Sequence, residues 1–496
     1  MKLKVKFLKW HAGIPVAMLH HKTAEKLGVR IQGLISIKTL SRNPKELSTI
    51  IDTINEPYVR ENEILVSWEI KNEMSLERGQ KVDINIALPP KSLDYIKKKL
   101  NDIRLSKEEI SEIVRDISKN SLSESEIALF VAAIYDQEFN FKETISMIEA
   151  MVKYGTKFKI TGKYVVDKHS IGGVAGNRTT PLVVSICSAA GLTFPKTSSR
   201  AITSAAGTAD VVELIANVDF KPKELKKIIK KVGAFMVWGG SLDIVPVDSK
   251  IIKVEKDLKI DPKSNLIASI MSKKFAVGSK YILIDIPYGS GAKVSRKKAE
   301  KLKNEFLKIG KHFHKKLECV LTDGSQPIGN GVGPALELID IIKILDPKQE
   351  GPEDLEKKSL FLSGQIFEMT GKSKKGHGIK LAKEILYSGK AFEQFKKIIK
   401  AQGGSLERLN NHKAKFSKDI FSRKSGKVAS IDNPKINSLA RAAGCPADKF
   451  SGIYLYHHVG ERVKKGEKIL TVHSETPSRL KQAVTFYNNE KPIIVK

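Results

Sequence analysis

The sequence has little of what marks secreted, membrane or metal-binding proteins. Its three cysteines, Cys187, Cys319 and Cys445, are far apart and form no Cys-x-x-Cys pair. This spacing argues against a zinc ribbon and favours a reducing, cytoplasmic location. No apolar run reaches the roughly 18 residues that cross a membrane, and residues 1–7 alternate like a strand rather than a signal peptide. We therefore expect no membrane partner and no bound metal.

Acidic residues are in the minority, since 55 Asp and Glu stand against 86 Lys and Arg and leave a net charge of +31. Such an excess is typical of nucleic-acid-binding proteins, but it also fits a lysine-rich surface or a pocket for an anionic small molecule. The lysines are spread along the chain, and basic and aromatic residues do not interleave as in RNA-binding modules. We expect no nucleic-acid partner. A basic nucleic-acid-binding protein without catalysis is the alternative from another class of function.

Changes in residue patterning predict an α/β protein of several domains. Short β-branched runs that alternate with helical stretches indicate a mainly parallel sheet in the middle of the chain. Before it, Ser106, Ser123 and Asn140 each precede a Glu by three residues, which is the signature of a helix start. The predicted domains are a β-rich N-terminal domain (1–88), an all-α domain (89–157), an α/β domain (158–423) and a small α+β domain (424–496).

The first segment with a chemical signature is 167–177, which lies between a predicted strand and a predicted helix. Its glycines allow the backbone to approach an anion, which then faces the N–H groups of the helix start. Lys168 supplies a positive charge and Ser170 a hydroxyl donor. The spacing is that of neither GxGxxG nor a P-loop. A phosphate-binding loop and an ordinary glycine-rich turn both remain open here.

The second segment, 197–210, is rich in hydroxyl groups and small residues. A protein core would not tolerate so many hydroxyls without partners, and the segment leads directly into an apolar helical run. Donors directed into a cleft explain both features, and Arg200 has the forked guanidinium that grips phosphate. An exposed loop is the alternative.

Two later segments add candidate polar groups. Asp261 precedes a proline, and Ser269 and Lys273 follow four residues apart, hence on one helix face. Lys293 ends a glycine-rich segment after a strongly apolar strand, at the kind of strand end where α/β proteins bind ligands. Taken alone, Asp261 is most simply a helix-start residue, and Lys293 a solvated lysine.

Together these segments resemble the thymidine and pyrimidine-nucleoside phosphorylase family over roughly residues 90–496. The run 198–210 and the additional N-terminal domain resemble more narrowly the branch of this family that acts on AMP. The matching pieces, in the family's order, are Asp167-Lys168-His169-Ser170 with Gly172-Gly173, Ser198-x-Arg200, Gly207-Thr208 and Ser269-x-x-x-Lys273-Lys274.

The resemblance implies a more specific domain architecture than the changes in residue patterning do. The all-α domain would be completed by residues 248–276 and would face the α/β domain, 158–247 and 277–423, across a cleft that closes on substrate. The C-terminal α+β domain would resemble a small lipoyl-type barrel. A homodimer or larger homo-oligomer is expected.

The implied reaction is reversible phosphorolysis of AMP, and of nucleotides such as CMP and UMP, to free base and ribose 1,5-bisphosphate. Inorganic phosphate is a co-substrate and no cofactor is expected. In thymidine phosphorylases an arginine grips the pyrimidine, and Val254 stands at that position here. This replacement disfavours thymidine, and a pyrimidine-nucleoside phosphorylase is the alternative within the family.

The resemblance also assigns residues to roles. Asp261 corresponds to the proton donor, which needs a pKa raised above the usual value of about 3.9 to protonate a leaving adenine. Ser269 and Lys273 correspond to base contacts. The inorganic-phosphate contacts correspond to Lys168, Ser170, Thr179, Ser198 and Thr208. The AMP contacts correspond to Gly173, Ser199, Arg200, Ala201, Ile202, Thr203, Ser204, Thr208, Ser269 and Lys293.

Overall fold

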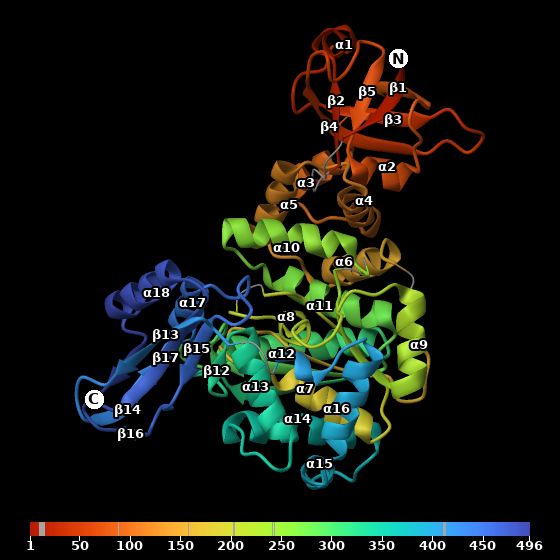
Figure 1. Cartoon of the computed structure of the whole chain (residues 1–496). Helices are drawn as coiled ribbons and strands as arrows, with labels where there is room; N and C mark the ends of the chain where they lie inside the picture. Colours follow the sequence, from red (N-terminus) through yellow and green to blue (C-terminus); the bar gives the residue numbers. More distant parts are fainter. Residues whose placement is uncertain are drawn as a thin grey trace. The chain divides into compact units, whose positions relative to one another are not determined.

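The computed structural model describes residues 1–8, 15–87, 89–156, 158–201, 204–240, 242, 244–409 and 413–496. Its contacts divide the chain into two compact units (Figure 1). The first comprises Met1–Gly155 and Val245–Ser272, and the second comprises Thr156–Ile244 and Lys273–Lys496. Within the described residues, no helix is both long and apolar enough to cross a membrane.

The N-terminal part of the first unit is a closed six-stranded barrel in the order β1-β5-β2-β4-β3-β6. In β1, Leu3 and Val5 point into the barrel core while Lys2 and Lys4 are exposed, so the alternation seen in the sequence is the alternation of the strand. Two short helices accompany the barrel, α1 (His21–Leu27) and α2 (Trp68–Met74). The strands are β1 (Lys2–Phe7), β2 (Val16–Leu19), β3 (Leu34–Thr39), β4 (Glu46–Thr53), β5 (Glu63–Val66) and β6 (Lys81–Ile86).

The rest of the first unit is helical. Ser106, Ser123 and Asn140 each form a complete capping box with the Glu three residues later, which confirms the three predicted helix starts. Glu143, one of these glutamates, also pairs with the buried Lys99 at 3.4 Å. The helices are α3 (Ser92–Leu100), α4 (Lys107–Ser118), α5 (Glu124–Asp136), α6 (Phe141–Lys153), α10 (Pro246–Leu258) and the first part of α11 (Lys263–Val277).

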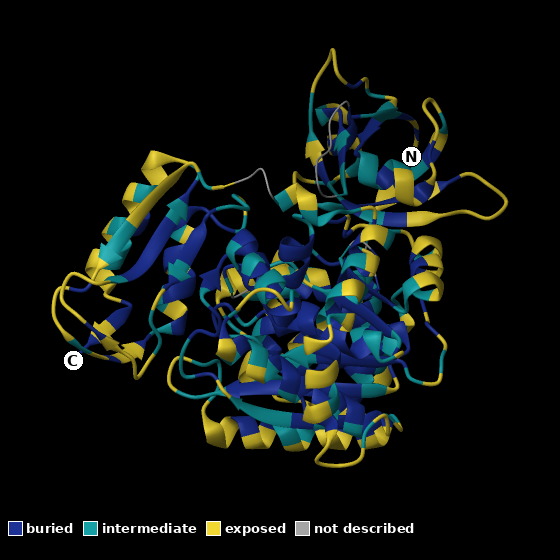
Figure 2. Ribbon diagram, turned by 60° about the horizontal axis from the view of Figure 1, so that its bottom comes forward, coloured by how far each residue is buried: buried dark blue, intermediate teal, exposed yellow. Residues whose placement is uncertain are grey.

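The second unit is built on parallel strands. β7 (Val166–Ser170), β10 (Tyr281–Tyr288) and β11 (Lys316–Asp323) form a parallel sheet in the order β11-β10-β7, and β8 (Phe194–Ser198) pairs in parallel with β9 (Ala234–Trp238). The central strand β10 is buried along almost its whole length, as expected for a parallel strand with both faces covered. Figure 2 colours buried residues dark blue, and these residues form the interior of the fold.

Helices cover this sheet and form most of its core. α12 packs on β10 and β11, α14 packs on β10, and α7 packs on α14 and α16. The helices of this part are α7 (Thr179–Ala189), α8 (Thr208–Val212), α9 (Pro222–Val232), α12 (Arg296–His312), α13 (Pro334–Leu345), α14 (Glu353–Thr370), α15 (Gly378–Tyr387) and α16 (Lys390–Ala401).

The C-terminal part of the second unit carries two further sheets, with orders β12-β15-β17-β13 and β16-β14-β18. The first of them begins before residue 424, since β12 and β13 precede that position. Helices α17 (Asn433–Ala443) and α18 (Pro477–Glu490) pack on the sheet (Figure 1). The strands are β12 (Gly331–Val332), β13 (Phe416–Phe421), β14 (Gly426–Ile431), β15 (Gly452–Leu455), β16 (Arg462–Val463), β17 (Lys468–Ser474) and β18 (Ile493–Val495).

Candidate active site

The glycine-rich loop after β7 lies where parallel strands end. Ser170, the last residue of β7, is in register with Asp285 of β10. Gly172 and Gly173 have φ values of 86° and 92°, which only glycine adopts readily. A Cβ on Gly173 would lie 2.9 Å from the backbone nitrogen and Cβ of Lys293. The predicted residues Gly173 and Lys293 are therefore in close contact.

Lys168 and Thr179 also meet. Lys168 is only 1 % exposed, and its Nζ donates a hydrogen bond of 2.6 Å to Oγ1 of Thr179, the first residue of α7. Burial lowers the pKa of Lys168 to about 8, and the neighbouring Asp285 opposes this shift. A buried ammonium at a helix start, beside glycines in left-handed conformation, is well suited to bind phosphate.

Two buried carboxylates balance the lysines around this loop. Asp167 pairs with Lys196 at 3.1 Å and with Lys274 at 2.7 Å, and burial lowers the pKa of Lys274 to about 7. Asp285 pairs with Lys358 at 3.3 Å. Burial opposes its ionisation, but Lys358 and Lys168 hold its pKa below the usual range.

Sequence reasoning gave neither carboxylate a role, although both stand inside the segments that it singled out.

His169, between Asp167 and Ser170, lies among the same lysines. Enclosure of its ring, followed by the charges of Lys274 and Lys196, lowers its pKa well below the usual value. This histidine is therefore neutral near pH 7.

The hydroxyl-rich segment runs from the end of β8 to the start of α8. Asp210 in α8 accepts hydrogen bonds of 2.8 Å from the backbone N–H groups of Ala201 and Gly207, which closes the loop on itself. Ser199 is exposed, and Ser204 donates to the carbonyl of Ala206. At the end of β8, Ser198 makes a long hydrogen bond of 3.5 Å to the carbonyl of Val237. The predicted contacts Ile202 and Thr203 lie outside the described residues.

Thr208 is held by an arginine that the sequence reasoning missed. Arg178 is 9 % exposed and donates to Thr208 Oγ1 at 3.3 Å and to the Ala206 carbonyl. Its Nε pairs with the buried Glu337 at 2.6 Å. Burial raises the pKa of Glu337, and Arg178 opposes this shift. The only signal in the sequence was an arginine directly before an apolar helix.

Arg200 does not present an open fork to an anion. Its two terminal nitrogens lie 2.7 and 2.6 Å from the carboxylate oxygens of Glu213, and its guanidinium lies 4.8 Å from the centre of the Trp238 ring. Arg200 and Lys449 lower the pKa of Glu213 to about 2. The terminal end of the Arg200 fork could grip phosphate, as expected from the sequence, only if this ion pair opened, because Nη1 and Nη2 are already bound to Glu213.

The remaining candidates are divided between the units. Asp261 is exposed and lies two residues before α11, and Ser269, in that helix, is 7 % exposed. Both belong to the first unit, whereas Lys273, one turn further along α11, begins a segment of the second. The loops after β7, β8 and β10 all belong to the second unit. In the described ranges, no three His, Cys, Asp or Glu residues are grouped to hold a metal ion.

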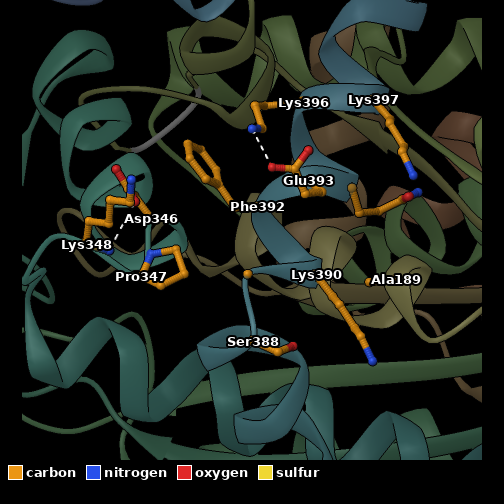
Figure 3. Close-up of a pocket in the computed structure, with 12 residues that line it drawn as sticks. Ala189, Asp346, Pro347, Lys348, Ser388, Lys390, Phe392, Glu393, Lys396 and Lys397 are labelled. Atoms are coloured by element: carbon orange, nitrogen blue, oxygen red, sulfur yellow. Dashed lines mark hydrogen bonds and ion pairs between the residues drawn. The ribbon is translucent and has the colours of Figure 1, made fainter.

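Two cavities of the second unit contain none of the predicted site residues. One, of about 600 Å³, is bordered by the ends of α13 and α16 (Figure 3). Four lysines line it, but Lys396 pairs there with Glu393 at 2.5 Å and Asp346 adds a second acid. The other, of about 320 Å³, is lined in part by Lys358 and Thr322, which both contact Asp285.

Three family models match the chain. They are the helical bundle domain of the glycosyl transferase family at residues 93–155, the a/b domain of that family at residues 162–392, and the pyrimidine nucleoside phosphorylase C-terminal domain at residues 427–493. The chain thus has an α/β architecture with a helical bundle before the α/β domain and a further domain after it.

Curated relatives match over the whole chain. The AMP phosphorylase of Thermococcus kodakarensis is 42 % identical over 500 residues, which cover 100 % of this chain and 98 % of the relative. The AMP phosphorylase of Methanococcoides burtonii is 39 % identical, with 100 % and 97 % covered. This chain belongs to the AMP phosphorylase family. Members of this family are glycosyl-transferring enzymes. The membership confirms the resemblance inferred from the sequence motifs.

A solved structure shares the fold. The crystal structure of anthranilate phosphoribosyltransferase from Thermus thermophilus has a TM-score of 0.52 and 18 % identity, and the match covers 63 % of this chain and 100 % of that one. At this identity the likeness concerns the fold alone.

Proposed function

We propose that this chain catalyses the reversible phosphorolysis of AMP, with inorganic phosphate as co-substrate and adenine and ribose 1,5-bisphosphate as products. Similarity to AMP phosphorylases over the full chain supports the reaction. The observation that carries it is the buried Lys168–Thr179 pair beside Gly172 and Gly173, because this group of residues suits a phosphate nucleophile.

In the proposed mechanism, Lys168, Ser170 and Thr179, with Ser198 and Thr208, hold inorganic phosphate for attack on C1′ of the ribose. Holding the nucleophile in the correct orientation removes much of the entropic barrier. The developing positive charge on the sugar is then balanced by the bound anion. Gly173, Thr208, Lys293 and the 199–204 segment would bind the nucleotide. The terminal nitrogens of Arg200 would join them only after release from Glu213.

Adenine leaves poorly as an anion, so protonation of a ring nitrogen, N7, is required. We assign this step to Asp261, and contacts with the base to Ser269 and Lys273. Asp261 belongs to the first unit, and the glycine-rich loop after β7 belongs to the second.

The proposal extends to CMP and UMP as further substrates, to a homo-oligomeric enzyme without a cofactor and to action in the cytoplasm.

A pyrimidine-nucleoside phosphorylase is the second candidate within the family. Val254, which replaces the arginine of thymidine phosphorylases in the resemblance, favours the nucleotide over thymidine.

The test is release of adenine from AMP with and without inorganic phosphate. We expect release only with phosphate, and a much lower specificity constant for adenosine, which lacks the 5′-phosphate. Equal specificity constants for AMP and adenosine would exclude the nucleotide assignment, and preferred cleavage of thymidine would favour the second candidate.

A further inference from the structure

Helix α17 of the C-terminal part carries a row of polar side chains that reaches both anion-binding segments. Asn433, Asn437 and Arg441 are spaced four residues apart and therefore lie on one face of the helix. Each donates to, or accepts from, the backbone of one of these two segments. We propose that these three are positioning residues. They hold the glycine-rich segment 167–177, the phosphate loop, and the hydroxyl-rich segment 197–210, the nucleotide loop, in their binding conformations.

Asn433 holds the glycine-rich loop. Its Oδ1 accepts a hydrogen bond of 3.0 Å from the N–H of Ala175, and its Nδ2 donates one of 2.9 Å to the carbonyl of Gly324. Its side chain is fully buried. A Cβ on Gly291 would lie 3.6 Å from the Asn433 nitrogen. One asparagine thus lies where the loops after β7, β10 and β11 converge.

Asn437 and Arg441 hold the other segment. Asn437 Oδ1 accepts a hydrogen bond of 2.9 Å from the N–H of Ala205, and Arg441 donates to the carbonyl of Ser204 at 3.0 Å. Asn437 is 5 % exposed. Buried polar side chains of this kind specify one geometry, because loss of the partner leaves a desolvated group unpaired.

The two loops are attached in the same way. Ala175 and Ala205 are both fully buried, and both side chains belong to the hydrophobic core of the C-terminal part, together with Ile436 and Leu439 of α17. Each loop therefore places one methyl group in that core while the N–H of the same residue is bound by an asparagine. This double attachment fixes both the position and the orientation of the backbone on either side of each alanine.

The inference rests on the proposed function, since it names what sets the geometry of that site. Ala175 follows the proposed inorganic-phosphate contacts Lys168 and Ser170 along the chain, and Ala205 follows the proposed nucleotide contacts of the 199–204 segment. Gly173, which is assigned to the nucleotide, also precedes Ala175, so Asn433 should have a smaller effect on AMP as well. Loss of each asparagine should then affect mainly the substrate whose loop it holds. A role in domain docking alone would affect both substrates alike.

The experiment is steady-state kinetics of Asn433→Ala and Asn437→Ala in the full-length chain, with AMP and phosphate varied in turn. We expect Asn437→Ala to raise KM for AMP about three- to tenfold, the loss that one hydrogen bond provides, with a smaller change in KM for phosphate. Asn433→Ala should instead raise KM for phosphate more than KM for AMP. Asn437→Asp keeps the acceptor for Ala205 and should restore KM for AMP, and the control Ser438→Ala, exposed on the same helix, should match the unaltered chain.

Arg441→Ala provides a variant at an exposed position, with a melting temperature that we expect to be unchanged. It should raise KM for AMP about two- to threefold through loss of one hydrogen bond. Unchanged KM values in all three variants, or equal rises for both substrates, would overturn the positioning role. Absence of adenine release by the unaltered chain would instead refute the proposed function, so the two failures are distinguishable.

Discussion

The Nζ atom of Lys168, in the middle of β7, lies 2.6 Å from the Oγ1 atom of Thr179, the first residue of α7, and both residues are buried. An ammonium carries three N–H donors and a threonine hydroxyl one. Because Thr179 accepts from Lys168, its own proton is directed away from the lysine. The pair can therefore donate together to one oxygen-rich anion.

Phosphate affinity should fall as the pH rises above about 8. The pKa of Lys168 is lowered to about 8 by burial, so the ligand-free lysine loses its charge well below the usual lysine value of about 10.4. Calorimetric titration with phosphate from about pH 7 to about pH 10 covers this range. Lys168→Met should bind weakly at every pH. A wild-type affinity that stays constant over the range would contradict the role of Lys168.

Asp261→Asn should lower kcat by about 10²- to 10⁴-fold, the usual contribution of general acid catalysis. AMP binding should change little, because the amide keeps the size of the carboxyl group and loses only its proton. Turnover and the dissociation constant for AMP measure the two effects separately. Asp257→Asn, at an exposed position in α10, is the matched control. Wild-type turnover in the Asp261 variant would remove that residue from the mechanism.

Arg178→Met should destabilise the chain by about 3–5 kcal/mol, since it leaves the carboxylate of Glu337 buried without its partner. The double variant with Glu337→Gln removes the stranded charge and should recover most of that stability, as measured by denaturant unfolding. Its substrate KM values should remain raised, because Thr208 still lacks the donor at 3.3 Å. Recovery of KM together with stability would show that Arg178 supports the fold only.

Gly173→Ala should weaken both folding and AMP binding. An alanine there has to adopt a φ of 92° and place its Cβ 2.9 Å from the Lys293 backbone. Gly403→Ala is the control, because its φ of 73° imposes similar strain while no atom lies within 4 Å of the added Cβ. Left-handed strain alone costs about 1–2 kcal/mol. The difference in unfolding free energy between the two variants isolates the steric clash, and equal values would contradict a close contact with Lys293.

The sequence was most informative where structure depends on near neighbours. The capping boxes at Ser106, Ser123 and Asn140 could be predicted because donor and acceptor are three residues apart. The helix predicted directly after the segment 167–177 is α7, Thr179–Ala189. These local signals placed the motifs correctly at strand and helix ends.

The candidate site was predicted less completely because its supporting contacts are remote in sequence. Asn433 and Ala175 are separated by 258 positions, and Arg178 and Glu337 by 159, so no local pattern relates them. Arg200 was expected to face phosphate, since nothing in its segment reveals that Glu213 and Trp238 surround it. The assignments of Asp261 and Ser269 came from the resemblance to relatives, not from their spacing.

The barrel at the start of the chain restricts how that part of the molecule can recognise anything else. Each of its six described strands is hydrogen-bonded on both sides, so its backbone offers no edge to which a further strand could be added. A partner of the barrel, including another copy of the chain, has to bind through side chains and loops. Specificity in such a contact is set by surface residues alone, and these can be changed one at a time without altering the barrel.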